Sequence, residues 1–289
     1  MCIYSRSRQK HKAESPPTNP SPVLAQDGII VYYKFMYMRV ETDMNMIRKV
    51  LLLLIFTALL YLPLPDSTYG LSIPGDTERY RERRHKMVET QIVARGVTDE
   101  LVLKAMRDVP RHLFVPTRSR GSAYRDHPLA IGYGQTISQP YIVALMTELL
   151  KPKQDHVALE VGTGSGYQAA VLSEIVRSVY TIEIIPPLGN AARERLEEMA
   201  YKKVTVKIDD GYFGWKENAP FDCVIVTAAS DHVPPPLIAQ LKNGGRMVIP
   251  VGHPFQVQHL MLVTKSMEGE TQMRDILPVR FVPFRREWK

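Results

Sequence analysis

The stretch Val157-Ala-Leu-Glu-Val-Gly-Thr-Gly-Ser-Gly-Tyr-Gln168 decides the fold of this chain. An apolar run ends in an acid, and Gly162, Gly164 and Gly166 follow before a helix-forming run over 169–176. This order predicts a buried strand, a tight turn and a helix N-terminus. Glycine lets the backbone approach a ligand closely, and the first turn of a helix offers free N–H groups to an anion.

Two acidic residues frame this turn. Glu160 lies just before the first glycine, and Glu183 ends the next apolar run. A carboxylate in the second position can accept hydrogen bonds from ribose hydroxyls. Glu160 would repel a pyrophosphate, and Tyr167 stands where a dinucleotide motif has its third glycine. The pattern therefore favours S-adenosylmethionine, which carries a sulfonium, an ammonium and a ribose. A purely structural turn is the alternative.

Apolar segments alternate with helical segments toward the C-terminus. We expect strands at 157–161, 178–182, 204–208, 221–227, 246–251 and 259–264, and helices at 168–176, 189–200 and 235–241. This alternation is typical of a mainly parallel sheet that is covered on both faces. Few helical segments separate the last strands, so an antiparallel pair is expected there. Ligands of such sheets bind beyond the C-terminal ends of the strands, where the motifs cluster.

The segment before this sheet is expected to be largely helical. The predicted helices cover 79–95, 100–107 and 141–150, and 111–133 is interpreted as a loop. Gly96 should end the first helix, and Asp99 should cap the second. Ser138-Gln139-Pro140 is typical of a serine N-cap with a proline in the first turn of the helix.

The first 70 residues differ from the rest. Residues 1–43 are polar and proline-containing, and are interpreted as disordered or as a misannotated leader before a start at Met44 or Met46. Val50–Leu62 contains thirteen residues without a charge, preceded by Arg48 and Lys49. This pattern is typical of a signal-peptide core.

Residues 44–70 are therefore predicted to be a signal-like or anchor segment, with membrane contact through 50–62. An amphipathic flank is a further alternative. The remaining residues, 71–289, are predicted to form one domain, with an N-terminal helical part over 71–150 and the sheet over 151–289.

The composition narrows the classes of partner. The formal net charge is +7, but no basic run is interleaved with aromatic residues, so nucleic acid is not expected as a partner. Cys2 and Cys223 are the only cysteines, which excludes a disulfide framework. The eight histidines show no metal-ligand spacing, so no metal is predicted.

From about residue 109 to the C-terminus, the chain resembles the protein-L-isoaspartate O-methyltransferase family, which are class I methyltransferases. The matching stretches are VPRHLFVP at 109–116, GQTISQP at 134–140, EVGTGSGYQ at 160–168, YTIE at 180–183, DGYFGW at 210–215, APFD at 219–222, VTAA at 226–229 and VRFVPF at 279–284. The stretch at 134–140 is more specific than the glycine motif, whereas residues 1–70 fall outside the resemblance.

The resemblance implies a doubly wound, mainly parallel seven-stranded Rossmann-like sheet with an antiparallel edge. It also implies methyl transfer from S-adenosylmethionine to the side-chain carboxylate of L-isoaspartyl residues in age-damaged proteins and peptides, which starts repair through a succinimide. The carboxylate is already ionised at neutral pH and the sulfonium is an activated donor. The protein must therefore supply mainly alignment and exclusion of water.

By the same resemblance Ser138 is the active-site serine. We expect it to hydrogen-bond the substrate carboxylate, because no His/Asp pair flanks it to make it a nucleophile; a helix cap is the alternative. Thr136 and Ile137 should form the same substrate-binding lip. The expected cofactor-binding residues are Glu160, Gly162, Thr163, Gly164, Ser165, Gly166, Glu183, Asp210, Gly211 and Thr227, with Asp210 and Gly211 at the adenine and Thr227 near the methionine part.

Two rival functions stay open, and a third lacks its sequence motif. A class I methyltransferase could act on another acceptor. A non-catalytic cofactor-binding envelope protein would explain the apolar N-terminus, although it should have lost Ser138 or the glycines. A nicotinamide oxidoreductase would need a glycine at position 167. The family and its cofactor imply the cytoplasm, whereas the segment at 44–70 suggests export or membrane anchoring.

Overall fold

The computed structural model describes residues 24–60, 73–253 and 256–287. The chain divides into two compact units, Met1–Leu71 and Ser72–Lys289. Predictions that concern residues 1–23 and 61–70 lie outside the described residues.

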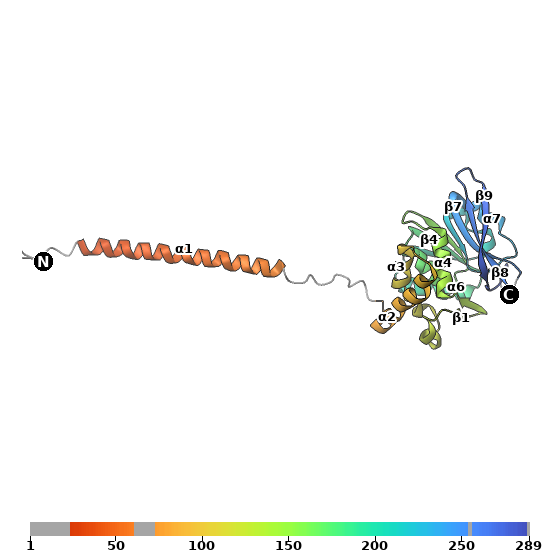
Figure 1. Ribbon diagram of the computed structural model, residues 1–289, viewed down its shortest axis with the longest axis horizontal. Coiled ribbons are helices and arrows are strands. Elements are labelled where there is room, and N and C mark those ends of the chain that lie inside the picture. Colours follow the sequence, from red (N-terminus) through yellow and green to blue (C-terminus); the bar gives the residue numbers. More distant parts are fainter. Residues whose placement is uncertain (1–23, 61–72, 254–255, 288–289) are drawn as a thin grey trace, which may run out of the picture. The chain divides into compact units, whose positions relative to one another are not determined.

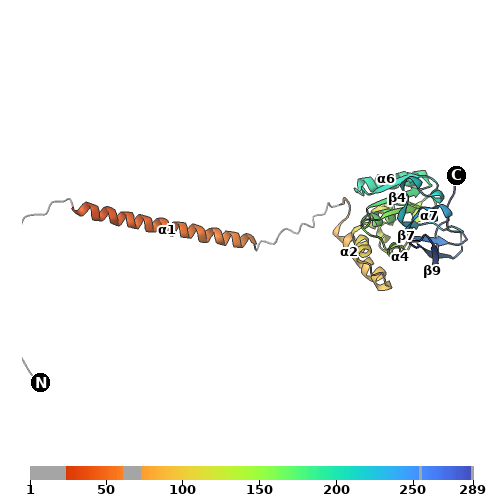
Figure 2. The ribbon, with the colours of Figure 1, turned by 90° about the horizontal axis from the view of Figure 1, so that it is seen from above.

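The first unit contains one long helix, α1 (Leu24–Leu60), which is unbroken in both views (Figures 1 and 2). The prediction of disorder is therefore wrong for residues 24–43, and the predicted boundary at 43/44 falls inside a helix. The four prolines that motivated it end at Pro22, and no proline follows until Pro63. Among the described residues, no helix combines the length and the apolarity that crossing a membrane requires.

The second unit is built on a seven-stranded sheet with the order β5-β4-β3-β6-β7-β8-β9. Its strands are β3 (Val157–Val161), β4 (Ser178–Glu183), β5 (Val204–Ile208), β6 (Phe221–Val226), β7 (Leu241–Val251), β8 (Gln258–Lys265) and β9 (Thr271–Val279). All pairs from β5 to β7 are parallel, and β7–β8 and β8–β9 are antiparallel. The predicted fold class is confirmed, and β9 supplies the seventh strand that had no predicted position.

Helices cover both faces of this sheet. They are α4 (Pro140–Leu150), α5 (Tyr167–Ser173), α6 (Pro186–Glu198) and α7 (Pro235–Gln240). Successive strand side chains point to opposite faces. Ala158 accordingly joins the buried cluster that includes α4 and α5, whereas Leu159 joins the cluster that includes Leu237 of α7. The strand order changes direction at β3, where the ligand site of such a sheet is expected.

The N-terminal helical part packs against the first of these clusters. It comprises α2 (Glu78–Met87), the π-helical turn η1 (Val88–Ile92), the 3-10 turn η2 (Val93–Arg95) and α3 (Glu100–Asp108). The predicted helix over 79–95 therefore changes type after Met87. Gly96 ends it in the left-handed conformation, at φ 89°. Asp99 caps α3 by accepting the N–H groups of Leu101 and Val102, as predicted.

The predicted loop over 111–133 contains more structure than expected. It forms the 3-10 turns η3 (Arg111–Phe114) and η4 (Thr117–Ser122) and then strand β1 (Leu129–Gly132). β1 pairs in antiparallel fashion with β2 (Gln135–Ile137), and this hairpin leads directly to α4. Two more 3-10 turns, η5 (Gly211–Phe213) and η6 (Lys216–Asn218), follow β5.

Candidate active site

The glycine turn follows β3, and its conformation explains its sequence. Gly162, Gly164 and Gly166 have φ values of 100°, 54° and 85°, a region that side-chain-bearing residues rarely adopt. A Cβ added to Gly162 would lie 2.4 Å from Oγ1 of Thr227, at the end of β6. A Cβ on Gly166 would lie 3.1 Å from Leu196 of α6. The first glycine therefore permits contact between two strand ends, and the third permits the packing of α6.

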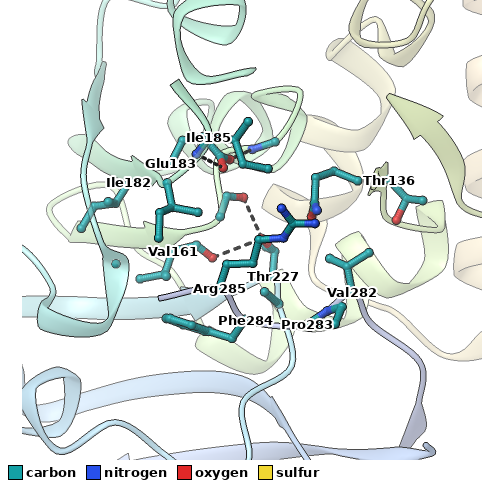
Figure 3. Close-up of a pocket in the computed structure, with 16 residues that line it drawn as sticks. Thr136, Val161, Ile182, Glu183, Ile185, Thr227, Val282, Pro283, Phe284 and Arg285 are labelled. Carbon is teal, nitrogen blue, oxygen red and sulfur yellow. Dashed lines mark hydrogen bonds between the residues drawn. The ribbon is translucent and has the colours of Figure 1, made fainter. Parts of the chain in front are cut away.

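Thr227 contacts the glycine turn from the end of β6. Its hydroxyl donates to the carbonyl oxygen of Gly162 at 2.7 Å, and the carbonyl of Val161 lies at 3.2 Å (Figure 3). The hydroxyl hydrogen is thus used within the protein. Thr227 can offer a ligand only its oxygen lone pair. Its contact with the methionine part of the cofactor stays a prediction.

Glu183 joins the end of β4 to the glycine turn. Its Oε2 accepts the N–H of Gly164 at 2.8 Å, and its Oε1 accepts the N–H of Ile185 at 3.0 Å. Burial raises the pKa of the Glu183 carboxyl, and these backbone donors partly offset the rise. Each carboxylate oxygen keeps a lone pair, so the group can still accept hydrogen bonds from a ribose.

Glu183→Gln should weaken cofactor binding by about 1–3 kcal/mol. The amide –NH₂ would face one of the backbone N–H groups that the carboxylate now accepts, and the charge-assisted bonds would be lost. Calorimetry with S-adenosylhomocysteine measures the effect, with the exposed Glu268→Gln as the matched control. An affinity equal to that of the control would show that Glu183 does not contact the cofactor.

Glu160 lies fully buried beneath the turn. Its Oε2 accepts the hydroxyl of Thr181 at 2.6 Å, and that hydroxyl lies 2.7 Å from the hydroxyl of Thr163. Among the described residues, Oε1 has no hydrogen-bond partner. Burial raises the pKa of Glu160 to about 8; the Thr181 hydrogen bond lowers it and the Glu183 charge raises it further. A cationic ligand in the adjoining cavity would favour the ionised form, as the sequence predicted for a sulfonium or an ammonium.

This raised pKa predicts a pH-dependent stability. Above its ordinary pKa, near 4.3, Glu160 ionises in the unfolded chain but stays protonated in the folded one. The free energy of unfolding should therefore begin to fall as the pH rises through that value, with the loss complete above about pH 8. Glu160→Gln should flatten this slope in thermal melts of the cofactor-free protein. Equal slopes in both proteins would contradict the assignment.

Thr163 and Ser165 direct their side chains into the protein. Thr163 belongs to the buried group around Glu160. The Ser165 hydroxyl accepts the N–H of Tyr167 at 3.4 Å, and its carbonyl accepts from Arg195 at 2.9 Å. Cofactor contact by these two residues stays a prediction, and it would fall to their backbone groups.

The residues after β5 form the other end of the site. Gly211 lines a cavity beside the ends of the strands, and a Cβ there would lie 2.4 Å from Cγ1 of Val161. Asp210 accepts the N–H of Tyr212 at 3.0 Å through Oδ1, and Nε of Arg286 at 2.8 Å through Oδ2. Asp210 does not itself line the cavity, so its contact with an adenine stays a prediction.

These segments enclose a cavity beyond the C-terminal ends of the central strands (Figure 3). Its lining residues are Gln135, Thr136, Val161, Gly162, Gly164, Ile182, Glu183, Ile184, Ile185, Gly211, Thr227, Ala228, Val282, Pro283, Phe284 and Arg285. The structure thus brings together six predicted residues: Thr136, Gly162, Gly164, Glu183, Gly211 and Thr227. We call this space the cofactor cavity.

Ser138 lies on the lip between β2 and α4. The N-cap residue of α4 is Gln139, and no side chain caps the helix. The alternative interpretation of Ser138 as a helix cap is therefore wrong, because Pro140 is the first helical residue and the cap position falls one residue later than predicted. Ser138 is half-buried, and its hydroxyl forms no hydrogen bond with any residue that the structure describes. It is available to a substrate.

The lip connects two further spaces to the cofactor cavity. Ser138 lines a small cavity shared with Glu160 and the glycine turn, and also an open groove that runs along the end of β9. Thr136 and Thr227 line all three spaces. Ile137 is buried in the core, so its side chain supports the lip from below.

The sequence interpretation missed the C-terminal wall of the site. Val282 accepts the N–H of Ala229 at 2.8 Å, and the N–H of Phe284 donates to the Ala229 carbonyl at 2.8 Å. These bonds place residues 282–285 against the end of β6, where they line the cofactor cavity. The available signal was the matching stretch at 279–284, which had been given no role.

Other residues behave as structural elements. Asp222 accepts the N–H of Val157 at 2.9 Å and so caps the start of β3. Trp215 packs edge-on against Tyr180, with ring centroids 5.3 Å apart. Within the described ranges, no three His, Cys, Asp or Glu side chains gather as metal ligands would.

The geometry of the site suits the transfer of a group from a cationic donor to an anionic acceptor. Glu160 and Glu183 offer carboxyl groups to the positive and hydroxyl parts of a nucleoside cofactor. Ser138 lines both an open groove and the small cavity beside the glycine turn, so an acceptor could enter through the groove without crossing the cofactor. No base is required if the acceptor is already ionised.

Comparisons with known proteins agree with this geometry. The model of the family Protein-L-isoaspartate(D-aspartate) O-methyltransferase matches residues 82–288. Protein-L-isoaspartate O-methyltransferase 1 of Nitrosospira multiformis is 56% identical over 232 residues, 80% of this chain and 95% of that protein. A protein-L-isoaspartate O-methyltransferase of Opitutus terrae is 56% identical over 209 residues, 72% of this chain and 89% of that protein.

Solved structures show the same architecture. One protein-L-isoaspartate O-methyltransferase superposes with a TM-score of 0.63 at 29% identity, over 70% of this chain and 65% of that one. A Plasmodium falciparum protein, described as a putative member and solved in complex with S-adenosyl-L-homocysteine, gives a TM-score of 0.62 at 24% identity, over 71% of this chain and 99% of that one. At that identity the likeness extends to the fold alone.

Proposed function

Because the chain belongs to the protein-L-isoaspartate(D-aspartate) O-methyltransferase family, we propose that it methylates the side-chain carboxylate of L-isoaspartyl residues in damaged proteins and peptides. S-adenosylmethionine supplies the activated methyl group. The observation that carries this proposal is the position of Ser138: its hydroxyl has no partner among the described residues, and it lines both the open groove and the small cavity beside Glu160 and the glycine turn.

The residues of the site have separate roles. Glu183 accepts the ribose hydroxyls and holds the glycine turn at Gly164. The buried carboxyl of Glu160 lies beneath the turn and becomes negatively charged when the cationic groups of the donor bind beside it. Ser138 hydrogen-bonds the acceptor carboxylate and orients one of its oxygens toward the methyl group. Such alignment, with water excluded, is the main contribution a protein can make to this transfer.

A panel of acceptors tests the proposal. A peptide with one L-isoaspartyl residue should be methylated far faster than the same peptide with a normal aspartyl residue, since both carry an ionised carboxylate and differ only in backbone connectivity. Faster labelling of an unrelated acceptor would favour another class I methyltransferase. Binding of S-adenosylhomocysteine without methyl transfer to any acceptor would favour a non-catalytic protein.

We further propose that the apolar segment at 50–62 directs the chain to the cell envelope. In the described part of this segment, Val50 to Ile55 expose half or more of each side chain, and Arg48 and Lys49 precede them. An apolar stretch behind a basic pair can contact a membrane surface or serve as an export signal.

A shortened protein beginning at Ser72 should be soluble and retain full activity, because all the site residues belong to the unit Ser72–Lys289. If the segment is a cleaved signal, terminal sequencing of the native protein should find cleavage near residue 70. If it is an uncleaved anchor, the native chain should keep the segment and sediment with membranes. A cytoplasmic product that keeps residues 1–43 would contradict the proposal.

A further inference from the structure

The C-terminal segment 282–286 lies along one side of the cofactor cavity. Val282, Pro283, Phe284 and Arg285 line the cavity, and Figure 3 shows the Arg285 side chain extended over it. Two backbone hydrogen bonds to Ala229 fix the beginning of the segment to the end of β6.

Arg286 fastens the other end of this segment to the residues after β5. Its Nε donates to Oδ2 of Asp210 at 2.8 Å. Its guanidinium carbon lies 3.7 Å from the centre of the Tyr212 ring, and that ring meets Phe284 edge-on, with ring centroids 6.5 Å apart. Asp210 in turn accepts the N–H of Tyr212. One side chain therefore holds together the segment, the acid and the ring beside Gly211.

We propose that Arg286 is a positioning residue for the cofactor, acting through Asp210 and Tyr212. It holds segment 282–286 closed over the adenine end of the cavity, and so sets the affinity and residence time of the cofactor and of its demethylated product. This inference rests on the proposed use of the cavity for S-adenosylmethionine.

The ion pair between Arg286 and Asp210 can break and form again. The side chain of Arg286 is 48% exposed and that of Asp210 is 18% exposed, so water and salt weaken the ion pair. The planar guanidinium both donates to the carboxylate and stacks on Tyr212, which a lysine could not do equally well. Neither contact touches Ser138 or the groove, so the chemistry of transfer should depend on it little.

The test compares cofactor affinity with turnover. Arg286→Gln should raise the dissociation constant for S-adenosylhomocysteine about three- to tenfold and speed its release similarly. At saturating cofactor, kcat should fall less than twofold. Arg286→Lys should restore part of the affinity because it keeps the charge. Arg274→Gln, an exposed change on β9, is the matched control and should leave both quantities unchanged.

The dependence of S-adenosylhomocysteine affinity on salt concentration gives a second measurement. Raising the ionic strength should weaken binding in the wild-type protein more than in Arg286→Gln, which has no ion pair to screen. Unchanged affinity in a folded Arg286→Gln protein would overturn the inference, as would equal losses in affinity and kcat with a lowered melting temperature. Because the binding measurement uses no acceptor, failure to methylate isoaspartyl peptides would contradict the proposed function separately.

Discussion

Gly162→Val is expected to abolish cofactor binding, with a loss of roughly a hundredfold or more. The new Cβ would lie 2.4 Å from Oγ1 of Thr227, and the backbone at φ 100° is strained for any residue with a side chain. Relief requires the turn to move away from the end of β6, which would break the Thr227 hydrogen bond to the Gly162 carbonyl. That movement also displaces Gly164 from Glu183.

Calorimetry with S-adenosylhomocysteine measures this loss. Gly121→Val is the matched control, since a Cβ there meets nothing within 4 Å and its φ is not positive. Circular dichroism must show that the Gly162 variant is folded. A folded variant with unchanged affinity would show that this turn does not hold the cofactor.

Ser138→Ala should lower turnover on an isoaspartyl peptide by about ten- to a hundredfold while cofactor affinity changes little. A hydrogen bond to a charged group contributes about 1.5–3 kcal/mol, and the Ser138 hydroxyl has no competing partner among the described residues. Since Ser138 does not cap α4, the change should leave the melting temperature close to the wild-type value.

Single-turnover rates with bound cofactor separate the two effects, with Ser119→Ala as the control. An equal fall in cofactor affinity, with normal turnover of the bound complex, would assign Ser138 a structural role only.

The central part of the fold could be predicted because its signals are local. The apolar runs of β3 and β4, the glycines between β3 and α5 and the acids at the strand ends all occur within short stretches of sequence. The environment of Glu160 could not be predicted in this way. Thr181 reaches it because β3 and β4 align Glu160 opposite Thr181, and this register is a property of the folded sheet.

The features that were predicted wrongly or missed also depend on more than the local sequence pattern. β9 has mostly exposed residues and no clear alternation, so its pattern does not indicate a strand. Ser138 satisfies the composition of an N-cap, but Pro140 shifts the cap to Gln139. The four prolines up to Pro22 suggested disorder over residues 1–43, but the residues after Pro22 form α1 from Leu24 onward. Segment 282–286 has no periodicity, and only its pairing with Ala229 places it at the site.

The most direct test of isoaspartyl methylation by this protein measures both the methyl ester and the conversion of the isoaspartyl linkage to the aspartyl linkage. The protein and S-adenosylmethionine are incubated with an isoaspartyl peptide, and with its aspartyl counterpart, and the products are separated by chromatography and identified by mass. The account predicts a methyl ester on the isoaspartyl peptide alone, followed by conversion of part of that peptide to the aspartyl form. Equal methylation of both peptides, or no ester on either, would contradict it.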